Sequence, residues 1–405
     1  MIAAPLAQTL ELPNGATLKN RVAKAAMSEQ LGTKQNGPTE GLVKLYETWG
    51  RGGAGLLITG NVMIDRRALG EPANVALEDD RDLELLGAWA SAAQADGALA
   101  VMQINHPGRQ SPRVVVAEPV APSAVPLEGF AGAFAPPRAL HEAEIEEIIR
   151  RFATTAGLAV RGGFAGVEVH GAHGYLISQF LSPHTNRRDD GWGGTAEKRR
   201  RFLFEVLRAV REAIGPRAIL ALKLNSADFQ RGGFSEEESM DVVRLLNDTG
   251  LDLLEISGGT YEKPPTSQEK PRRESTRKRE AYFLEYAEQV RAITTMPLML
   301  TGGMRSVEGM AAALASGVDV VGLARPLAVE PDLPNRLLSG ATEEALKIDL
   351  QLGIKKLDDF LEVSWYQQQL MRMARGQLPD PDSCRLGAVI KGLVHAFTHR
   401  PRPPS

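Results

Sequence analysis

Two histidines and a tyrosine stand close together after one apolar stretch, and their side chains could hold and protonate a polar substrate. Residues 166–171 (GVEVHG) include His170, and His173 and Tyr175 follow shortly afterwards. Side chains alternate along a strand, so Glu168 and His170 share a face. Three kinds of site are open for the histidines: a metal centre, a packed core, or a pair of N–H donors for one developing oxyanion.

The remaining polar candidates favour the donor pair over the other two readings. A metal site needs a third ligand, but the polar residues that follow other apolar runs include Gln103, Lys223 and Ser257, which are poor ligands. A lysine in the same cavity would also repel a cation. A histidine pair in the core would need hydrogen-bond partners. We therefore expect two imidazole donors, with Tyr175 close enough to supply a proton.

Lys223 and Gln103 suggest that a second, flat molecule lies beside the histidines. Lys223 has two possible roles, either as a Schiff-base amine or as the partner of a negative charge on a cofactor. The Gln103 amide offers both a donor and an acceptor, which suits the edge of a heterocycle. The small side chains of Ala25 and Ala26 leave room for a flat ring against the backbone.

The elements that position these residues alternate between strands and helices, which predicts a parallel sheet. Eight such units favour a closed (β/α)8 TIM barrel, whose sites lie at the carboxyl ends of the strands. An open doubly wound sheet would need a Gly-x-Gly-x-x-Gly turn after the first strand, and AKAAMSEQLG is not one. The predicted strands are 21–26, 55–60, 99–104, 166–171, 218–225, 251–259, 297–303 and 318–325, with helical segments at 80–96, 142–161, 196–214, 236–249, 280–294 and 305–316.

The last two strands end in features that favour phosphate binding. Gly302 and Gly303 follow the seventh strand, and Ala324 and Arg325 follow the eighth. Free N–H groups at helix starts bind phosphate, and this position in a barrel is a frequent phosphate site. Glycines that merely make tight turns are the alternative.

Three segments lie outside the eight units. Residues 8–20 alternate around Asn14-Gly15, which predicts a β-hairpin that could plug the barrel. Residues 107–140 form an excursion after the third strand. Residues 341–405 form a C-terminal extension with a helix over about 345–375, packed on the barrel of residues 1–340 rather than folded as an independent domain. On that helix Trp365, Tyr366, Met371 and Met373 either pack on the barrel or form an interface in a homo-oligomer.

Composition excludes several classes of protein. The net charge of −3 over 405 residues gives no sign of a nucleic-acid or membrane partner. One cysteine, Cys384, cannot form an intrachain disulfide, a cysteine-based zinc site or an iron–sulfur cluster. The first residues do not form a signal peptide, and no apolar run is long enough to span a bilayer. We expect a cytoplasmic protein that acts on a small molecule.

Four motifs together resemble the old yellow enzyme family of FMN-dependent ene-reductases. They are NRVAKAAMS, VMQINHPGRQ, GVEVHGAHGYLISQFLSPHTNRRDDGWGGT and LTGGM with VGLARPLAVEPDL, and they occur in the order of the predicted strands from about residue 5 to 335. The resemblance implies non-covalent FMN at the barrel mouth, reduced by NADH or NADPH. It implies hydride transfer to the β-carbon of an activated alkene (enone, enal or nitroalkene). A Schiff-base lyase that uses Lys223 remains the alternative.

The resemblance also assigns roles to residues. His170 and His173 would hold the substrate oxygen, and Tyr175 would protonate the α-carbon. Lys223 stands where the family usually has arginine, beside the flavin N1/O2 edge. No metal is implied. The residues implied to bind FMN are Ala25, Ala26, Met27, Ser28 and Gly60 at the ring, Gln103 and Lys223 at the pyrimidine edge, and Gly303, Ala324 and Arg325 at the phosphate.

Several positions depart from the family pattern. Ser28 stands where some bacterial members have a cysteine that tunes the flavin potential, and Gln30 stands where they have a tyrosine. Ala25-Ala26 replaces a more usual Ser-Pro or Thr-Pro. The single cysteine argues against the larger relatives that carry an iron–sulfur cluster. The basic segment 261–280 is either a solvated loop or a lid that contacts the phosphates of the nicotinamide cofactor.

Overall fold

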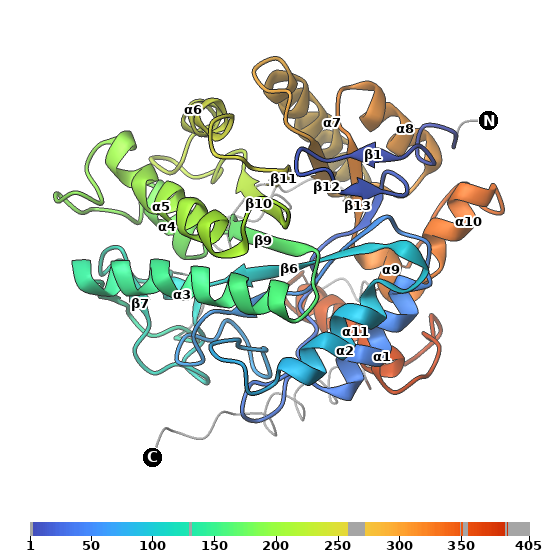
Figure 1. Ribbon diagram of the computed structural model, residues 1–405, viewed down its shortest axis with the longest axis horizontal. Coiled ribbons are helices and arrows are strands. Elements are labelled where there is room, and N and C mark those ends of the chain that lie inside the picture. The colour runs from blue at the N-terminus through green and yellow to red at the C-terminus, as the bar shows by residue number, and fades with distance from the viewer. Residues whose placement is uncertain are drawn as a thin grey trace.

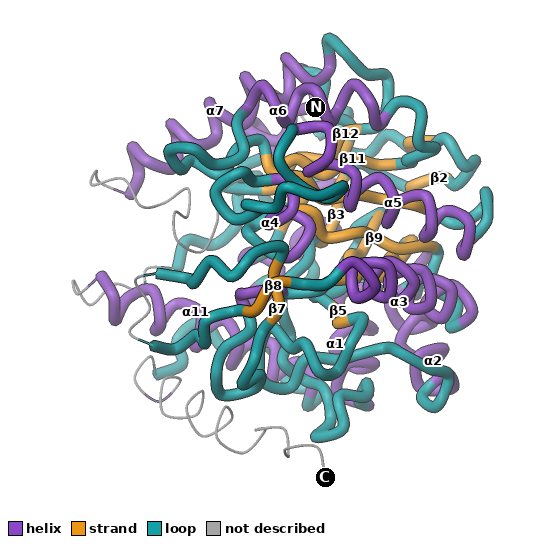
Figure 2. Tube along the Cα trace, turned by 90° about the vertical axis from the view of Figure 1, so that its left-hand side faces the viewer, coloured by secondary structure: helices purple, strands orange, loops and turns teal. Residues whose placement is uncertain are grey.

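Eight parallel strands close into a barrel in the computed structural model, which describes residues 3–128, 132–257, 272–348, 350, 355–384 and 387. Pairing of β13 with β3 and of β4 with β6 completes the ring. Helices surround the strands (Figures 1 and 2), so the predicted TIM barrel is confirmed. The barrel strands are β3 (Val22–Lys24), β4 (Leu56–Ile58), β6 (Leu99–Asn105), β9 (Gly166–Gly171), β10 (Ile219–Asn225), β11 (Leu253–Ser257), β12 (Leu298–Thr301) and β13 (Val320–Leu323).

Most of the outer helices begin where the sequence predicts them, because capping side chains fix their first turns. The hydroxyls of Thr195, Ser235 and Ser306 accept hydrogen bonds from N–H groups at the starts of α5, α6 and α8. The helices are α1 (Glu40–Gly50), α2 (Leu83–Ala93), α3 (Glu142–Arg161), α4 (Leu176–Leu181), α5 (Ala196–Ile214), α6 (Glu236–Leu246), α7 (Arg272–Arg291), α8 (Val307–Ala315), α9 (Arg325–Val329) and α10 (Leu333–Ser339).

The basic segment 261–280 differs from the prediction. Helix α7 begins at Arg272 rather than near residue 280, so the second half of the segment is helical instead of a loop. Residues 258–271 lie outside the described part of the chain. The predicted lid over the nicotinamide cofactor therefore falls largely on residues that the structure does not describe.

The N-terminal hairpin closes the bottom of the barrel, as predicted. Strands β1 (Leu10–Glu11) and β2 (Thr17–Leu18) pair antiparallel around a turn in which Gly15 has φ of +85°. The Asn14 side chain accepts a hydrogen bond from the Ala16 N–H at 3.2 Å, which stabilises this turn. Leu12 and Leu18 are buried in the same apolar cluster as the side chains inside the barrel.

The structure describes most of the excursion after β6. It contains η2 (Gly108–Gln110) and the parallel pair β7 (Val120–Ala121) and β8 (Arg138–Ala139). Strand β5 (Val62–Met63) pairs with the end of β6 and extends the sheet beyond the barrel. A short η1 (Ala95–Gly97) precedes β6.

The C-terminal extension is attached to several loops at the top of the barrel. Its first part pairs with the loop after β12, where Val307 N–H donates to the Glu343 carbonyl and Ala345 N–H to the Arg305 carbonyl. Helix α11 (Lys355–Ala374) lies against α1 and α9 (Figure 1). The Gln367 amide donates to the Glu29 carbonyl in the loop after β3.

Most of the described apolar side chains of α11 face the body of the chain, although Val363 is exposed. Trp365, Met371 and Met373 are buried and Tyr366 is partly buried, so packing is the correct reading of the four. Trp365 packs with Val329 of α9 and with Leu350. Packing accounts for the three buried residues, and the alternative of a homo-oligomer interface stays a prediction.

Side chains inside the barrel form an apolar lower layer and a polar upper layer, where the upper half holds the carboxyl ends of the strands. Alternation along each strand places every second residue inside. The lower layer contains Ala23, Leu56, Val101, Ala221, Leu253, Met299 and Val320. Two residues further along their strands stand Gln103, Lys223, Glu255 and Thr301, and β9 adds Glu168 beside them.

Candidate active site

His170, His173 and Tyr175 meet at the end of β9. The ring centroids of His170 and His173 lie 5.2 Å apart, and that of Tyr175 lies 4.8 Å from His170. His170 Nδ1 accepts a hydrogen bond from the Ala172 N–H at 3.2 Å. A neutral imidazole that accepts at Nδ1 carries its proton on Nε2, so His170 keeps one donor for a ligand.

The backbone at His173 is held in an uncommon conformation. Its φ of +59° lies in the left-handed region, which costs energy for a residue with a side chain. The Asn225 side chain accepts from the His173 N–H at 3.1 Å, and Gln110 donates to the His173 carbonyl at 3.0 Å. His173 Nε2 lies 2.6 Å from the Ser257 hydroxyl. When that hydroxyl donates, Nδ1 of His173 carries the proton and becomes a second donor.

Both imidazoles are neutral near pH 7. Burial, His173 and Lys223 hold the pKa of His170 well below its usual value. Burial and Lys223 lower the pKa of His173 to about 3. The pair can therefore donate two hydrogen bonds to a developing oxyanion without first carrying charge.

A polar layer lies directly below the histidines. Lys223 Nζ forms an ion pair with Glu255 Oε1 at 2.6 Å, and Gln103 Nε2 donates to Glu168 Oε1 at 2.6 Å. Burial acts to lower the pKa of Lys223, but the ion pair with Glu255 outweighs it and the pKa is raised. Lys223 is therefore a buried cation. A paired ammonium is a poor nucleophile, which disfavours the Schiff-base lyase.

The segment predicted to contact the flavin ring is fixed from behind by a buried network. The Tyr46 hydroxyl donates to the Glu29 carboxylate, which also accepts from the Gly60 N–H at 2.7 Å. Lys24 donates to Tyr46 at 3.2 Å and to the Ile58 carbonyl at 2.6 Å. This network joins the loop after β3 to the loop after β4, so residues 25–28 and Gly60 keep a fixed spacing.

Ser28 is held by an acid that the sequence analysis did not identify. Its hydroxyl donates to the Glu71 carboxylate, which comes from the segment between β5 and α2. Burial raises the pKa of Glu71. Ala25 is buried, whereas Ala26, Met27 and Ser28 are partly exposed, so this edge is open to a ligand.

The loops predicted to bind the phosphate follow β12 and β13. The glycines of the first loop adopt uncommon backbone angles, whereas the Arg325 side chain of the second is paired with another residue. Gly302 and Gly303 have φ of +141° and +76°, which side-chain-bearing residues rarely adopt. The neighbouring turn after β13 contains Ala324 and Arg325. The Arg325 guanidinium forms an ion pair with Glu362 of α11 and remains half exposed. It must leave Glu362, or share it, before it can bind a phosphate.

The residues at the barrel mouth fit FMN. A Cβ on Gly60 would meet Met27 O at 2.4 Å, so the two loops pack closely at that point without a side chain between them. The amide of Gln103 and the cation of Lys223 supply the polar groups that a pyrimidine edge requires. The donor set at the mouth therefore suits a flat heterocycle that becomes anionic when it is reduced.

The described part of the chain contains neither a metal centre nor a membrane span. No group of three His, Cys, Asp or Glu side chains there could hold a metal ion. No helix among these residues is long and apolar enough to cross a membrane.

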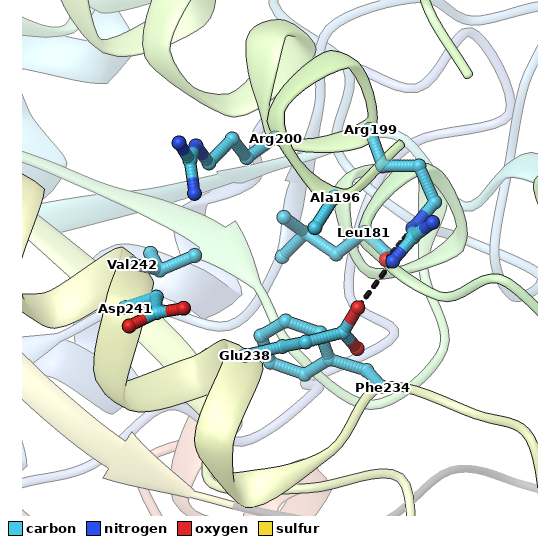
Figure 3. A pocket seen from close by; sticks show the side chains of 8 residues that line it. All are labelled: Leu181, Ala196, Arg199, Arg200, Phe234, Glu238, Asp241 and Val242. Atoms are coloured by element: carbon cyan, nitrogen blue, oxygen red, sulfur yellow. Dashed lines mark hydrogen bonds and ion pairs between the residues drawn. The ribbon is translucent and has the colours of Figure 1, made fainter. Parts of the chain in front are cut away.

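A cleft between α5 and α6 has a structural role instead of a catalytic one (Figure 3). Arg199 is buried there and forms an ion pair with Glu238. Arg199 also donates to the carbonyls of Leu181 and Gly194, at 2.9 and 3.0 Å. Glu238 caps the start of α6, so this arginine ties three segments together. The burial of an arginine at this position is thus explained by packing.

Two acids of the polar layer and one behind the flavin segment were missed as functional residues. Glu255 lies in the apolar run LDLLEIS, and Glu168 lies in GVEVHG, where strict alternation turns both inward. An acid on the inner face of a buried strand is a signal that the sequence carries. Glu29 had no such signal, because its partner Tyr46 lies on a helix that was not predicted.

Comparisons with known proteins identify the family of the chain. The chain matches the NADH:flavin oxidoreductase / NADH oxidase family over residues 6–344. It is 36% identical to the NADH-dependent flavin oxidoreductase iccE of Talaromyces variabilis, covering 91% of this chain and 98% of that protein. It is 38% identical to the NADH-dependent flavin oxidoreductase iliE of a Neonectria species, covering 83% of this chain but 47% of that relative.

A solved structure supports the same assignment. The old yellow enzyme homologue from Zymomonas mobilis superposes with a TM-score of 0.71 at 28% identity, covering 85% of this chain and 95% of that one. The chain therefore belongs to the NADH:flavin oxidoreductase family of old yellow enzymes, and its cofactors are FMN and NAD(P)H.

Proposed function

We propose that this protein is an ene-reductase that reduces the activated carbon–carbon double bond of an enone, enal or nitroalkene. The observation that carries the proposal is the neutral pair His170 and His173 beside Tyr175, above a buried cation. A neutral donor pair suits a carbonyl or nitro oxygen that gains negative charge during the reaction. A small molecule of this class is the expected partner.

Each protein group has one task in this reaction. His170 and His173 bind the substrate oxygen and polarise the conjugated double bond. Tyr175 protonates the α-carbon from the side of the site that it shares with His170. FMN, when bound, supplies the hydride that it has received from NADH or NADPH. Lys223 stabilises negative charge at the pyrimidine edge of the flavin.

Other residues hold the cofactor in this proposal. Gln103 binds the pyrimidine edge, and the network behind Ala25, Ala26, Met27, Ser28 and Gly60 fixes the wall against which the ring lies. The phosphate is bound by Gly303, Ala324 and Arg325. Arg325 first gives up its ion pair with Glu362 and then binds the phosphate instead.

A visible absorption titration tests the proposal. The purified protein should show oxidised-flavin bands, and a simple phenol should add a long-wavelength charge-transfer band because the histidines hold phenolate over the flavin. Addition of 2-cyclohexenone should then accelerate NADH or NADPH oxidation under anaerobic conditions. A flavoprotein that shows neither response to phenol nor alkene-dependent oxidation would contradict the ene-reductase assignment.

A further inference from the structure

The polar layer contains two buried carboxylic acids with different neighbours. Glu168 and Glu255 are both fully buried, and each extends into the barrel from a parallel strand on either side of β10. The mechanism proposed above uses neither acid. Taking two acids out of water is costly, so their neighbours decide which one stays charged.

Glu255 is the counter-ion of Lys223. The two residues are direct neighbours in the register of β10 and β11, and their side chains meet at 2.6 Å. Their side chains are 0% and 6% exposed, so water cannot screen the pair. Burial acts to raise the pKa of Glu255, but Lys223 outweighs it and the pKa is lowered. Glu255 is thus an anion.

Glu168 has no cation in direct contact among the interactions of the described residues. Its Oε1 accepts from the neutral amide of Gln103, and its protonated carboxyl group donates a hydrogen bond to the Glu255 carboxylate. Burial and the charge of Glu255 raise its pKa well above the usual value. Glu168 is therefore a neutral acid, and the three ionisable groups together carry no net charge.

We propose that Glu255 is a positioning residue that keeps the reduction potential of the bound flavin low by neutralising Lys223. This inference rests on the proposed function, in which Lys223 lies at the pyrimidine edge of FMN. A lone cation there would favour the anionic reduced flavin. A cation matched by an adjacent anion presents a dipole instead, whose attraction is weaker because the two charges act in opposite directions.

The matched variants are Glu255→Gln and Glu168→Gln, each purified with FMN and compared with the wild type. The midpoint potential at pH 7 is measured by anaerobic titration against a redox dye. Glu255→Gln removes a charge and should raise the potential. A tenfold gain in the affinity for reduced relative to oxidised flavin corresponds to about 30 mV for a two-electron couple. Glu168→Gln removes a proton-bearing oxygen but no charge, and should leave the potential within a few millivolts.

A double variant covers the case in which Glu255→Gln does not fold. Lys223→Met removes the cation from the pyrimidine edge of the flavin and should lower the potential. Lys223→Met with Glu255→Met removes the whole pair and should return the potential close to the wild-type value. Replacement of a buried ion pair by apolar groups of similar size is often tolerated.

The outcomes separate this inference from the proposed function. The inference about Glu255 is wrong if Lys223→Met lowers the potential but two other changes do not occur. These are a rise in Glu255→Gln above the wild-type potential and a rise in the double variant above the potential of Lys223→Met. Equal shifts in Glu255→Gln and Glu168→Gln would also overturn it, because the two acids would then carry the same charge. If the wild-type protein binds no FMN, or if Lys223→Met leaves the potential unchanged, the proposed cofactor position fails instead.

Discussion

The lower and upper halves of the barrel interior are built by the same strands but follow opposite rules. On β11, Leu253 lies in the lower apolar layer and Glu255 in the upper polar layer, two residues or about 6.6 Å apart. The lower half fills space with aliphatic side chains around Leu12 and Leu18 of the hairpin. The upper half instead buries ionisable groups, a strained residue and hydrogen-bonded amides.

This difference shows where the fold gains stability and where it gives stability up. Aliphatic burial contributes roughly 1.5–3 kcal/mol for each fully buried side chain. Buried charges and a positive φ at His173 cost free energy and persist only because surrounding groups hold them. The comparison predicts that upper-layer substitutions change chemistry, whereas lower-layer substitutions change stability.

The largest expected effect comes from Tyr175→Phe in the upper half. Loss of the hydroxyl removes the proposed acid, so alkene reduction should slow by roughly 10²–10⁴-fold. Reduction of the flavin by NADH or NADPH should keep its rate, because that half-reaction needs no proton from Tyr175. Stopped-flow absorbance measures the two half-reactions separately. Equal slowing of both would contradict the role of Tyr175.

The next largest effect comes from His170→Ala, which removes one of two oxyanion donors. The affinity for a simple phenol and the rate of enone reduction should each fall by about 10²–10³-fold. Retained flavin absorbance is the control that the barrel and cofactor remain intact. Unchanged phenol binding in a variant that still holds flavin would show that the imidazole does not contact the ligand oxygen.

A pH series tests buried histidines of the polar half, with His173 at the end of β9 and His106 directly after β6. Burial holds the pKa of His173 at about 3 and that of His106 at about 4, below the unfolded value of about 6.5. The unfolded state therefore binds more protons below pH 6.5, and stability is full above that pH and falls below it. As the pH falls from 6.5 to 5, each of these histidines should lower the free energy of unfolding by about 2 kcal/mol. Urea unfolding at several pH values measures this loss.

A matched histidine variant identifies the source of that slope. His106→Gln should reduce the dependence of unfolding free energy on pH between 5 and 6.5, since one titrating group is gone. A slope that is the same in the variant and the wild type would mean that His106 is not buried in its neutral form.

The smallest expected effect comes from Ile219→Val in the lower half. Ile219 is buried beside the hairpin, so loss of one methylene should cost about 0.5–1.5 kcal/mol of unfolding free energy. The midpoint potential of the flavin and the phenol affinity should not change. Chemical denaturation measures the first quantity. A shift in the flavin potential would show that the two layers are coupled and that their separation is incomplete.

The sequence predicted the barrel because each strand is a local pattern, and the structure agrees from Val22–Lys24 to Val320–Leu323. The positions of the histidines, Gln103 and Lys223 could be predicted for the same reason, since these residues lie at strand ends. Contacts between residues far apart in the sequence could not be predicted. The ion pair of Arg325 with Glu362 and the contact of Ser28 with Glu71 depend on how separate loops fold back.

The attachment of the C-terminal extension has a consequence for the order in which the active site matures during synthesis. Chains emerge from the ribosome from their N-terminus, and early segments begin to fold first. The loops after β3, β12 and β13 all receive contacts from residues 343–367, which are synthesised after all eight barrel strands. We expect the barrel strands to assemble before these three loops gain their last contacts, so cofactor loading is a late event in the production of this enzyme.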